Sequence, residues 1–177
     1  ASSWKGAIPG RDATRIVVAG APPPARTIER IEIELGWTFN QLYGLTETSP
    51  LLTVNSPSPE TDALSAAERS VVLSAAGVPA LGVETKIDET GEVLARSNVV
   101  MEGYWAQPEE TANAIVDGWF RTGDGGSIGE SHVLTIADRK KDVIISGGEN
   151  VSSIEVEGAI FSHPDVTEVA VDRKSVV

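Results

Sequence analysis

The sequence has no cysteine and only two histidines, His132 and His163. Disulfide bonds and thiolate metal sites are therefore excluded, and so is a histidine-rich metal site. Long hydrophobic runs are also missing, because the longest are as short as residues 143–145 and 99–101. No stretch could span a bilayer and no signal peptide opens the chain, so we expect a cytoplasmic protein.

Basic residues are scarce. Lys and Arg number 14 against 26 Asp and Glu, which gives a net charge of −12. Such a chain repels phosphate backbones and anionic lipid, so nucleic acid and membrane surfaces are poor partners. A nucleotide bound here has to be held by local geometry, by backbone N–H groups or by a metal ion.

The length of 177 residues and the hydrophobic content of 41% fit a globular protein with a real core. This is enough for one domain, or for one domain and a piece of another. The first residue is Ala1 and not Met, which fits a processed chain or a fragment of a longer one.

The first fifty residues predict a strand, a helix and a second strand. Residues 14–20 form an apolar, β-branched run, and residues 24–36 carry Ile28, Ile31 and Leu35 at helical spacing before Gly36. Residues 38–44 read as the second strand. Ligands of α/β sheets usually bind at the carboxyl ends of such strands.

The remaining chain changes character. Residues 56–60 read as a loop and residues 64–77 as a short helix, and after them we expect short strands over residues 82–88, 91–97 and 132–138, in a small β-barrel-like part. A helix over residues 107–115 interrupts them. Residues 152–163 predict a helix capped by Ser152 or Ser153, and residues 166–171 a last strand. The charge cluster at residues 138–142 is the candidate domain junction, which gives domains at 1–138 and 139–177.

The stretch QLYGLTETSP, residues 41–50, carries four residue types suited to a nucleotide site. Tyr43 can stack on a base, Thr46 can donate to a phosphate oxygen, and Glu47 is an oxygen ligand suited to Mg²⁺. Gly44 lies between them. The alternative is a half-buried strand end with an ordinary exposed glutamate.

Four further stretches each allow two interpretations. Gly20, in AGAPPP, either lets a flat ring approach the backbone or only turns the chain. Asp124, in DGWFRTGD, either accepts ribose hydroxyls or bonds its own turn. Arg139 either bonds a ribose or phosphate or belongs to a solvated charge run. The glycine pair in SGGEN, residues 146–150, either admits a ligand or turns the chain.

The order of these stretches resembles the adenylate-forming superfamily, which contains acyl-CoA synthetases, luciferases and adenylation domains of peptide synthetases. YGLTE at residues 43–47 is similar to its adenine and phosphate motif, and GYW at 103–105 with GWFRTGD at 118–124 to its ribose motif. Residues 138–157, DRKKDVIISGGENVSSIEVE, are similar to its hinge region. The match runs from about residue 15 to residue 171 and resembles most the medium- or long-chain acyl-CoA synthetases.

The resemblance implies a reaction in which ATP and a carboxylate, such as a fatty acid, form an acyl-adenylate that then passes its acyl group to CoA. It implies an α/β fold, namely the end of a large AMP-binding domain followed by the start of a small α+β domain, truncated at both ends. It also implies roles for individual residues. Gly20, Ala21, Pro22 and Tyr43 with Gly44 would form the adenine wall, Thr46 would bind the α-phosphate and Glu47 would bind Mg²⁺. Asp124 would bind the ribose, and Arg139 the ribose or a phosphate. Lys141 would be the hinge residue, Gly148 would border the pantetheine tunnel, and Leu45 would lie at the edge of the acyl pocket.

The sequence also departs from the family pattern. It contains neither the Ser/Thr/Gly-rich phosphate loop that ends in Pro-Lys nor the lysine near the end of the small domain, and Gly125 stands where a bulky apolar residue is usual. We therefore expect no adenylation activity from these 177 residues alone. Two alternatives stay open, which are a non-catalytic nucleotide-binding or interaction module and an adenylating enzyme that loads a carrier protein.

Overall fold

The computed structural model describes residues 6–129, 131–139, 144–146, 149–161, 163, 165, 166 and 168–171. Its first elements are the predicted strand, helix and strand, namely β1 (Arg15–Val18), α1 (Ala25–Arg30) and β2 (Thr38–Tyr43). The helix continues as one π-helical segment, η1 (Ile31–Leu35), and Gly36 ends it at a φ of 67°. A left-handed φ is easily adopted by glycine, so the predicted stop is confirmed.

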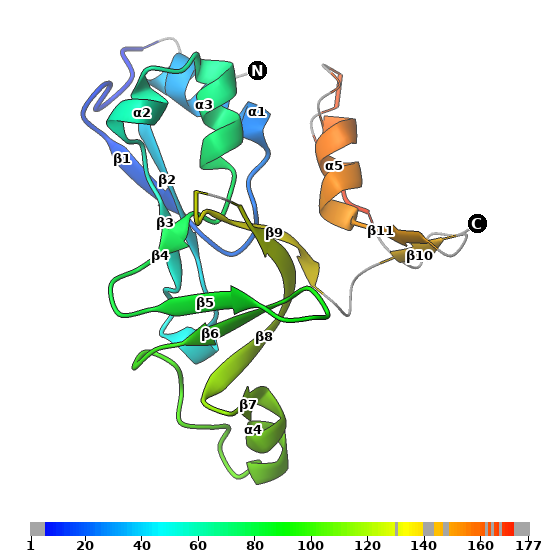
Figure 1. Cartoon of the computed structure of the whole chain (residues 1–177). Coiled ribbons are helices and arrows are strands. Elements are labelled where there is room, and N and C mark those ends of the chain that lie inside the picture. The colour runs from blue at the N-terminus through cyan, green and yellow to red at the C-terminus, as the bar shows by residue number, and fades with distance from the viewer. Residues whose placement is uncertain are drawn as a thin grey trace.

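The first sheet has the order β1-β2-β3-β4, with β3 at Thr53–Asn55 and β4 at Val78–Pro79. β1 and β2 are parallel, as the helical crossover between them requires. Ile28, Phe39 and Leu73 form its buried core, between the sheet and the helices α1 and α3 (Ala66–Leu73). Figure 1 shows α1 and α3 side by side next to β1 and β2.

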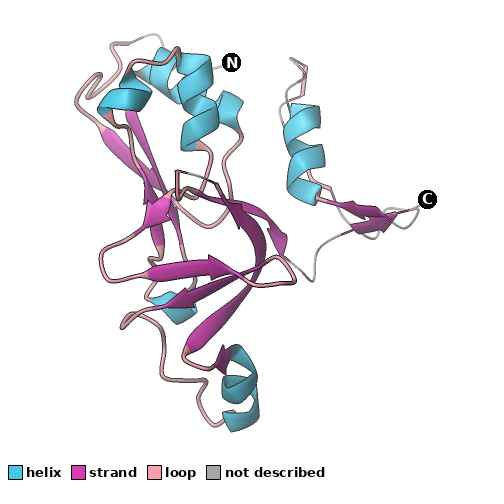
Figure 2. Ribbon diagram, in the orientation of Figure 1, coloured by secondary structure: helices cyan, strands magenta, loops and turns pink. Residues whose placement is uncertain are grey.

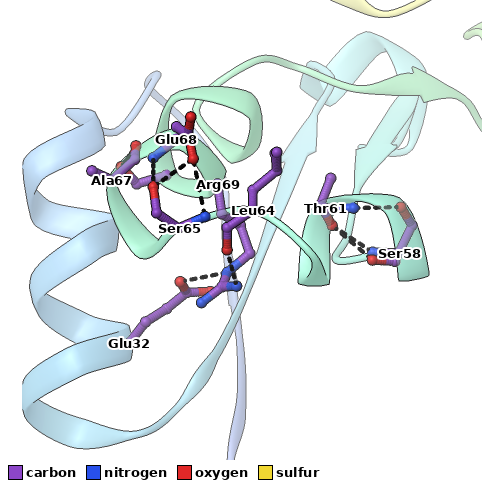
Figure 3. A network of polar contacts seen from close by, with 9 residues as sticks. Glu32, Ser58, Thr61, Leu64, Ser65, Ala67, Glu68 and Arg69 are labelled. Carbon is purple, nitrogen blue, oxygen red and sulfur yellow. Dashed lines mark hydrogen bonds and ion pairs between the residues drawn. The ribbon is translucent and has the colours of Figure 1, made fainter.

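Hydrogen bonds of serine side chains start the two helices that follow β3. Ser58 accepts from the backbone of Thr61 at the start of α2 (Pro59–Asp62), and Ser65 accepts from Glu68 at the start of α3 (Figure 3). The loop predicted over residues 56–60 is therefore partly wrong, because Ser58 and the following proline begin a short helix. Arg69 Nε lies 2.9 Å from Glu32 Oε2, which ties α3 to η1.

The second sheet is antiparallel and contains five strands in the order β5-β6-β8-β7, with β9 also paired to β8. The strands are β5 (Glu84–Ile87), β6 (Glu92–Arg96), β7 (Ile115–Val116), β8 (Trp119–Ile128) and β9 (Leu134–Arg139), and α4 (Pro108–Ala114) precedes β7. Figure 2 shows the sheet as a curved layer. In the part of the chain that the structure describes, no pairing closes this layer into the barrel-like form that we expected.

Ala76, Val93 and Leu134 form a second buried core, between the two sheets. A β-bridge between Gly77 and Leu134 also joins the regions. None of the helices in the described ranges has the length and hydropathy needed to cross a membrane.

The C-terminal part is a hairpin of β10 (Ile144–Ser146) and β11 (Glu149–Val151), followed by α5 (Ser153–Phe161). Ser152 Oγ accepts from Glu155 N at 3.3 Å, so the predicted serine cap is confirmed. The strand predicted over residues 166–171 is wrong for the described residues among them, since none pairs with another strand. Val171 N instead bonds Glu157 Oε1 of α5.

Candidate functional site

The parallel strands β1 and β2 bring two predicted segments to the same edge of the first sheet. Val18 pairs with Gln41, so Gly20 and Tyr43 both lie two residues farther along, at the carboxyl ends. Gly20 has a φ of 100°, and a Cβ built on it would meet no atom within 4 Å. The edge is open beside Gly20, as a ring that approaches the backbone there would require.

Tyr43 and Asp124 are joined by a hydrogen bond. Tyr43 Oη donates to Asp124 Oδ2 at 2.7 Å, across the boundary between the two sheets. The Tyr43 ring also packs against the second core, and burial raises the pKa of its phenol above the ordinary value. Tyr43 therefore stays a neutral donor to Asp124.

Asp124 is almost completely buried, with 6% of its surface exposed. Burial raises the pKa of its carboxyl above the ordinary value, although the Tyr43 hydroxyl and Arg139 favour the ionised form. A buried carboxylate with few competing water molecules is a strong acceptor for the hydroxyl groups of a bound ligand.

Arg139 is the cross-strand partner of Asp124, from β9. Its Nε lies 3.6 Å from Asp124 Oδ1, and its side chain is 56% exposed. This distance is too long for a good hydrogen bond, so Oδ1 can still accept one from a ligand while Arg139 supplies positive charge beside it. Two of the predicted site residues are thus direct neighbours.

The surroundings of Asp124 differ from the glycine turn that the sequence suggested. Asp124 lies inside the ten-residue strand β8, where the register with β6 shifts. Gly123 has a φ of 76°, which gives the strand a bulge in place of a turn. The glycine before Asp124 suggested a chain reversal, because bulges and turns both use a glycine in the left-handed conformation.

Glu47 lies in a short 3₁₀ helix, η2 (Thr46–Thr48), directly after β2. Its Oε1 accepts from the hydroxyl of Tyr104 at 3.0 Å, and its backbone oxygen accepts from Met101 N at 2.7 Å. Burial and the bond to Glu47 raise the pKa of Tyr104 above its ordinary value. The segment before α4 therefore fixes Glu47, whereas Thr46 beside it is exposed.

The described residues contain no group of three His, Cys, Asp or Glu side chains that could hold a metal ion. Glu47 can supply a single carboxylate, which fits Mg²⁺ only when phosphates and water complete its coordination.

Gly44 has a reason for its presence within this chain. A Cβ on Gly44 would overlap the backbone carbonyl of Pro50. The loop after β2 therefore folds closely onto Gly44, and packing explains this glycine without a ligand. The role of Gly44 beside a cofactor stays a prediction.

Of the remaining predicted residues, those that the structure describes make no hydrogen bond with Tyr43, Asp124 or Arg139. Ala21 is exposed and Pro22 and Leu45 are partly buried near the ends of β1 and β2. Lys141 and Gly148 lie outside the described residues. A hollow of about 570 Å³ beside α4 is lined by none of the predicted nucleotide residues, although Tyr104 and Trp105 border it.

Three residues without a separate predicted role contact this region. Tyr104 donates to Glu47 Oε1, Glu92 Oε1 accepts from Gly123 N, and Thr122 Oγ1 accepts from Asp124 N. Tyr104 belongs to the GYW motif, and that membership was its only signal. Glu92 belongs to the segment GEV, which has an ordinary strand pattern, and nothing in that pattern indicates that the carboxylate is buried.

Known proteins are similar to this chain in sequence and in fold. Residues 6–105 match the family of AMP-binding enzymes. The chain is 43% identical to the 2-methylpropanoate–CoA ligase of Humulus lupulus over 185 residues, which cover 96% of the chain and 33% of that ligase. It is 40% identical to the probable acyl-activating enzyme 5, peroxisomal, of Arabidopsis thaliana over 170 residues, 88% of the chain and 31% of the relative.

Solved structures show the same fold. A mutant of an amide bond synthetase from Marinactinospora thermotolerans has a TM-score of 0.77 and 35% identity, over 89% of this chain and 33% of its own. The o-succinylbenzoate CoA synthetase of Bacillus subtilis, in complex with ATP and magnesium ion, has a TM-score of 0.73 and 32% identity, over 89% and 33%.

The chain spans about a third of the length of these relatives. Its match to the family model covers more than half of its own residues. The chain belongs to the family of AMP-binding enzymes.

Proposed function

We propose that this chain is the nucleotide-binding part of an ATP-dependent acyl-CoA ligase. The observation that carries the proposal is the meeting of Tyr43, Asp124 and Arg139, which come from three separate motifs. A buried carboxylate with a neutral donor on one oxygen and a guanidinium near the other suits the two hydroxyls of a ribose.

The adenosine would lie along the open edge beside Gly20, Ala21 and Pro22, with Tyr43 against the base. Asp124 would accept the ribose hydroxyls. Thr46 is exposed and close in sequence to Glu47, so its hydroxyl could donate to the α-phosphate. Glu47 would hold Mg²⁺ together with the phosphates, and the ion would supply charge neutralisation there. Lys141 and Gly148 would serve the hinge and the pantetheine tunnel.

In the proposed reaction an oxygen of the carboxylate attacks the α-phosphorus of ATP, and pyrophosphate leaves with the electron pair of the broken P–O bond. The thiol of CoA then attacks the carbonyl carbon, its proton is lost, and AMP leaves. The substrate is proposed to be a fatty acid. The names of the relatives mention 2-methylpropanoate and o-succinylbenzoate, so short branched and aromatic acids belong in the same assay.

We infer that the 177 residues do not complete this reaction alone. The sequence contains no Pro-Lys pair to end a phosphate loop, although it contains the residues that we propose to bind adenosine. This same observation favours the second candidate, a module that binds nucleotide without catalysis. The cytoplasm is the proposed location, and a fluorescent fusion checks it, since one relative is named as peroxisomal.

Two assays test the proposal. The reading frame that contains these residues, expressed whole, should release pyrophosphate from ATP with Mg²⁺ and at least one carboxylic acid, and form a thioester when CoA is added. The 177-residue chain should bind AMP without releasing pyrophosphate. Turnover by the 177-residue chain would contradict its inferred inactivity. If the protein expressed from the whole reading frame shows no turnover with any acid, the proposed ligase activity fails and the non-catalytic module is favoured. A product that forms with a carrier protein and not with CoA would favour the carrier-loading alternative.

A further inference from the structure

The strand that carries Asp124 is distorted at Asp124. Leu94 of β6 pairs with Arg121 of β8 and Glu92 pairs with Gly125, so Val93 alone faces three residues of β8. Such bulges re-aim side chains and occur frequently next to active sites. Phe120, Thr122 and Asp124 are buried in alternation with exposed residues, so Asp124 keeps the buried face of β8, and the two added residues change where along β6 its carboxylate lies.

A buried carboxylate holds this bulge from the neighbouring strand. Glu92 is 4% exposed. Its Oε1 accepts from the backbone N–H of Gly123 at 3.0 Å, and its Oε2 lies 2.6 Å from Arg121 Nη2. One side chain thus binds the residues on either side of Thr122.

Thr122 fastens the same segment from within. Its hydroxyl donates to Val93 O at 2.8 Å and accepts from Asp124 N at 3.1 Å. Asp88 supports Glu92 in turn, because its Oδ1 accepts from Glu92 N at 2.9 Å. The backbone N–H groups of Gly123 and Asp124 and the carbonyl of Val93 thereby receive side-chain partners at the bulge.

Only the Glu92 side of the ion pair with Arg121 is buried, since the Arg121 side chain is 41% exposed. A buried carboxylate is a costly way to stabilise a strand, because it loses its hydration. The Glu92 carboxylate nevertheless contacts residues of β8 close to Asp124, namely Arg121 and Gly123. We infer that Glu92 is a positioning residue, which sets the Asp124 carboxylate in the orientation that accepts ribose hydroxyls. This inference rests on the proposed function, in which Asp124 binds ribose.

The test compares two nucleotides that differ only in these hydroxyls, AMP and 2′,3′-dideoxy-AMP. Their dissociation constants are measured on the 177-residue chain from ¹H–¹⁵N chemical shifts, which report weak binding as well. The unsubstituted chain should prefer AMP about tenfold or more, since a hydrogen bond to a charged group is worth roughly 1.5–3 kcal/mol. Glu92→Ala should reduce this preference to near equality while the affinity for dideoxy-AMP stays the same.

Glu84→Ala is the matched control. Glu84 lies in the adjacent strand β5 and makes an ion pair of the same length, 2.6 Å, with Arg96, but its side chain is 60% exposed. This control should keep the full preference for AMP. A purely structural role of Glu92 would weaken both nucleotides equally and leave the ratio unchanged, so the ratio separates the two roles.

The outcomes are distinguishable. A folded Glu92→Ala chain with the original ratio overturns the inference about Glu92. If Glu92→Ala does not fold, Thr122→Val, which removes the other fastening hydrogen bonds, must lower the ratio, and an unchanged ratio there overturns the inference. If Asp124→Ala keeps the preference, or if the unsubstituted chain shows none, Asp124 does not bind ribose, and the proposed ribose site fails together with the role of Glu92.

Discussion

Tyr43 and Asp124 are 81 positions apart in the sequence, and the Tyr43 hydroxyl donates a 2.7 Å hydrogen bond to the Asp124 carboxylate. The bond joins the end of β2 in the first sheet to the middle of β8 in the second. This hydrogen bond therefore joins the two sheets at the proposed nucleotide site.

Tyr43→Phe should remove this hydrogen bond and keep the packing of the ring against the second core. The free energy of unfolding should fall by about 1–3 kcal/mol, because a buried carboxylate loses a donor. Urea unfolding measures the change. Tyr43→Ala should cost clearly more, since the ring contacts are lost as well. Equal effects of the two variants would contradict the importance of the ring contacts, and an unchanged stability of Tyr43→Phe would contradict the importance of the hydrogen bond.

Asp124→Asn should change the dependence of stability on pH. Burial raises the pKa of Asp124 above its ordinary value of 3.8. Between 3.8 and the raised value the folded state binds more protons than the unfolded state, so the contribution of Asp124 to stability falls as the pH rises through this window. Asparagine does not titrate. The stability of Asp124→Asn relative to the unsubstituted chain should therefore increase as the pH rises from 3.8 through the raised pKa of Asp124.

Urea unfolding of both chains across this range gives the difference, and Asp165→Asn serves as control because Asp165 is exposed. A difference that is constant or that shrinks as the pH rises would show that burial does not disfavour the ionised form of Asp124.

Gly44→Ala should destabilise the chain even without nucleotide, because the added methyl group would overlap the carbonyl of Pro50. Overpacking of this kind costs about 1–3 kcal/mol, which thermal unfolding detects. Gly129→Ala is the matched control, since a Cβ at Gly129 meets no atom within 4 Å. If the two variants melt together, the loop does not pack on Gly44 in solution.

Asp138→Ala should loosen the start of α5. Asp138 is 6% exposed, and its Oδ2 accepts from both the backbone N–H and the hydroxyl of Ser153, each at 2.8 Å. Loss of such a cap costs about 1 kcal/mol, so amide hydrogen exchange in α5 should become several-fold faster. Asp165→Ala, an exposed change beyond the helix, should leave the exchange rates as they were. Unchanged rates in Asp138→Ala would mean that Ser152 alone holds this end.

Local patterns predicted the elements but not how they meet. The apolar run before Gly20 and the spacing of Ile28 and Ile31 were sufficient for β1, α1 and β2, because one short segment decides each of them. The motif resemblance selected Tyr43, Asp124 and Arg139, and the structure brings these three together.

The contacts between distant segments could not be predicted from the sequence. The bulge at Asp124 is bonded by Glu92 from another strand, whereas the residues around Asp124 suggested a turn. The strand expected over residues 166–171 had a suitable apolar pattern, but a strand also needs a neighbour, and none of the described strands pairs with it.

The nucleotide site is tested most directly by a titration of the 177-residue chain with AMP, followed by ¹H–¹⁵N chemical shifts. We expect saturable shifts at the amides of Gly20, Asp124 and Arg139, and a dissociation constant about tenfold weaker in Asp124→Ala. If no amide near Asp124 shifts, or if Asp124→Ala binds AMP as tightly as the unsubstituted chain, these residues do not form a nucleotide site.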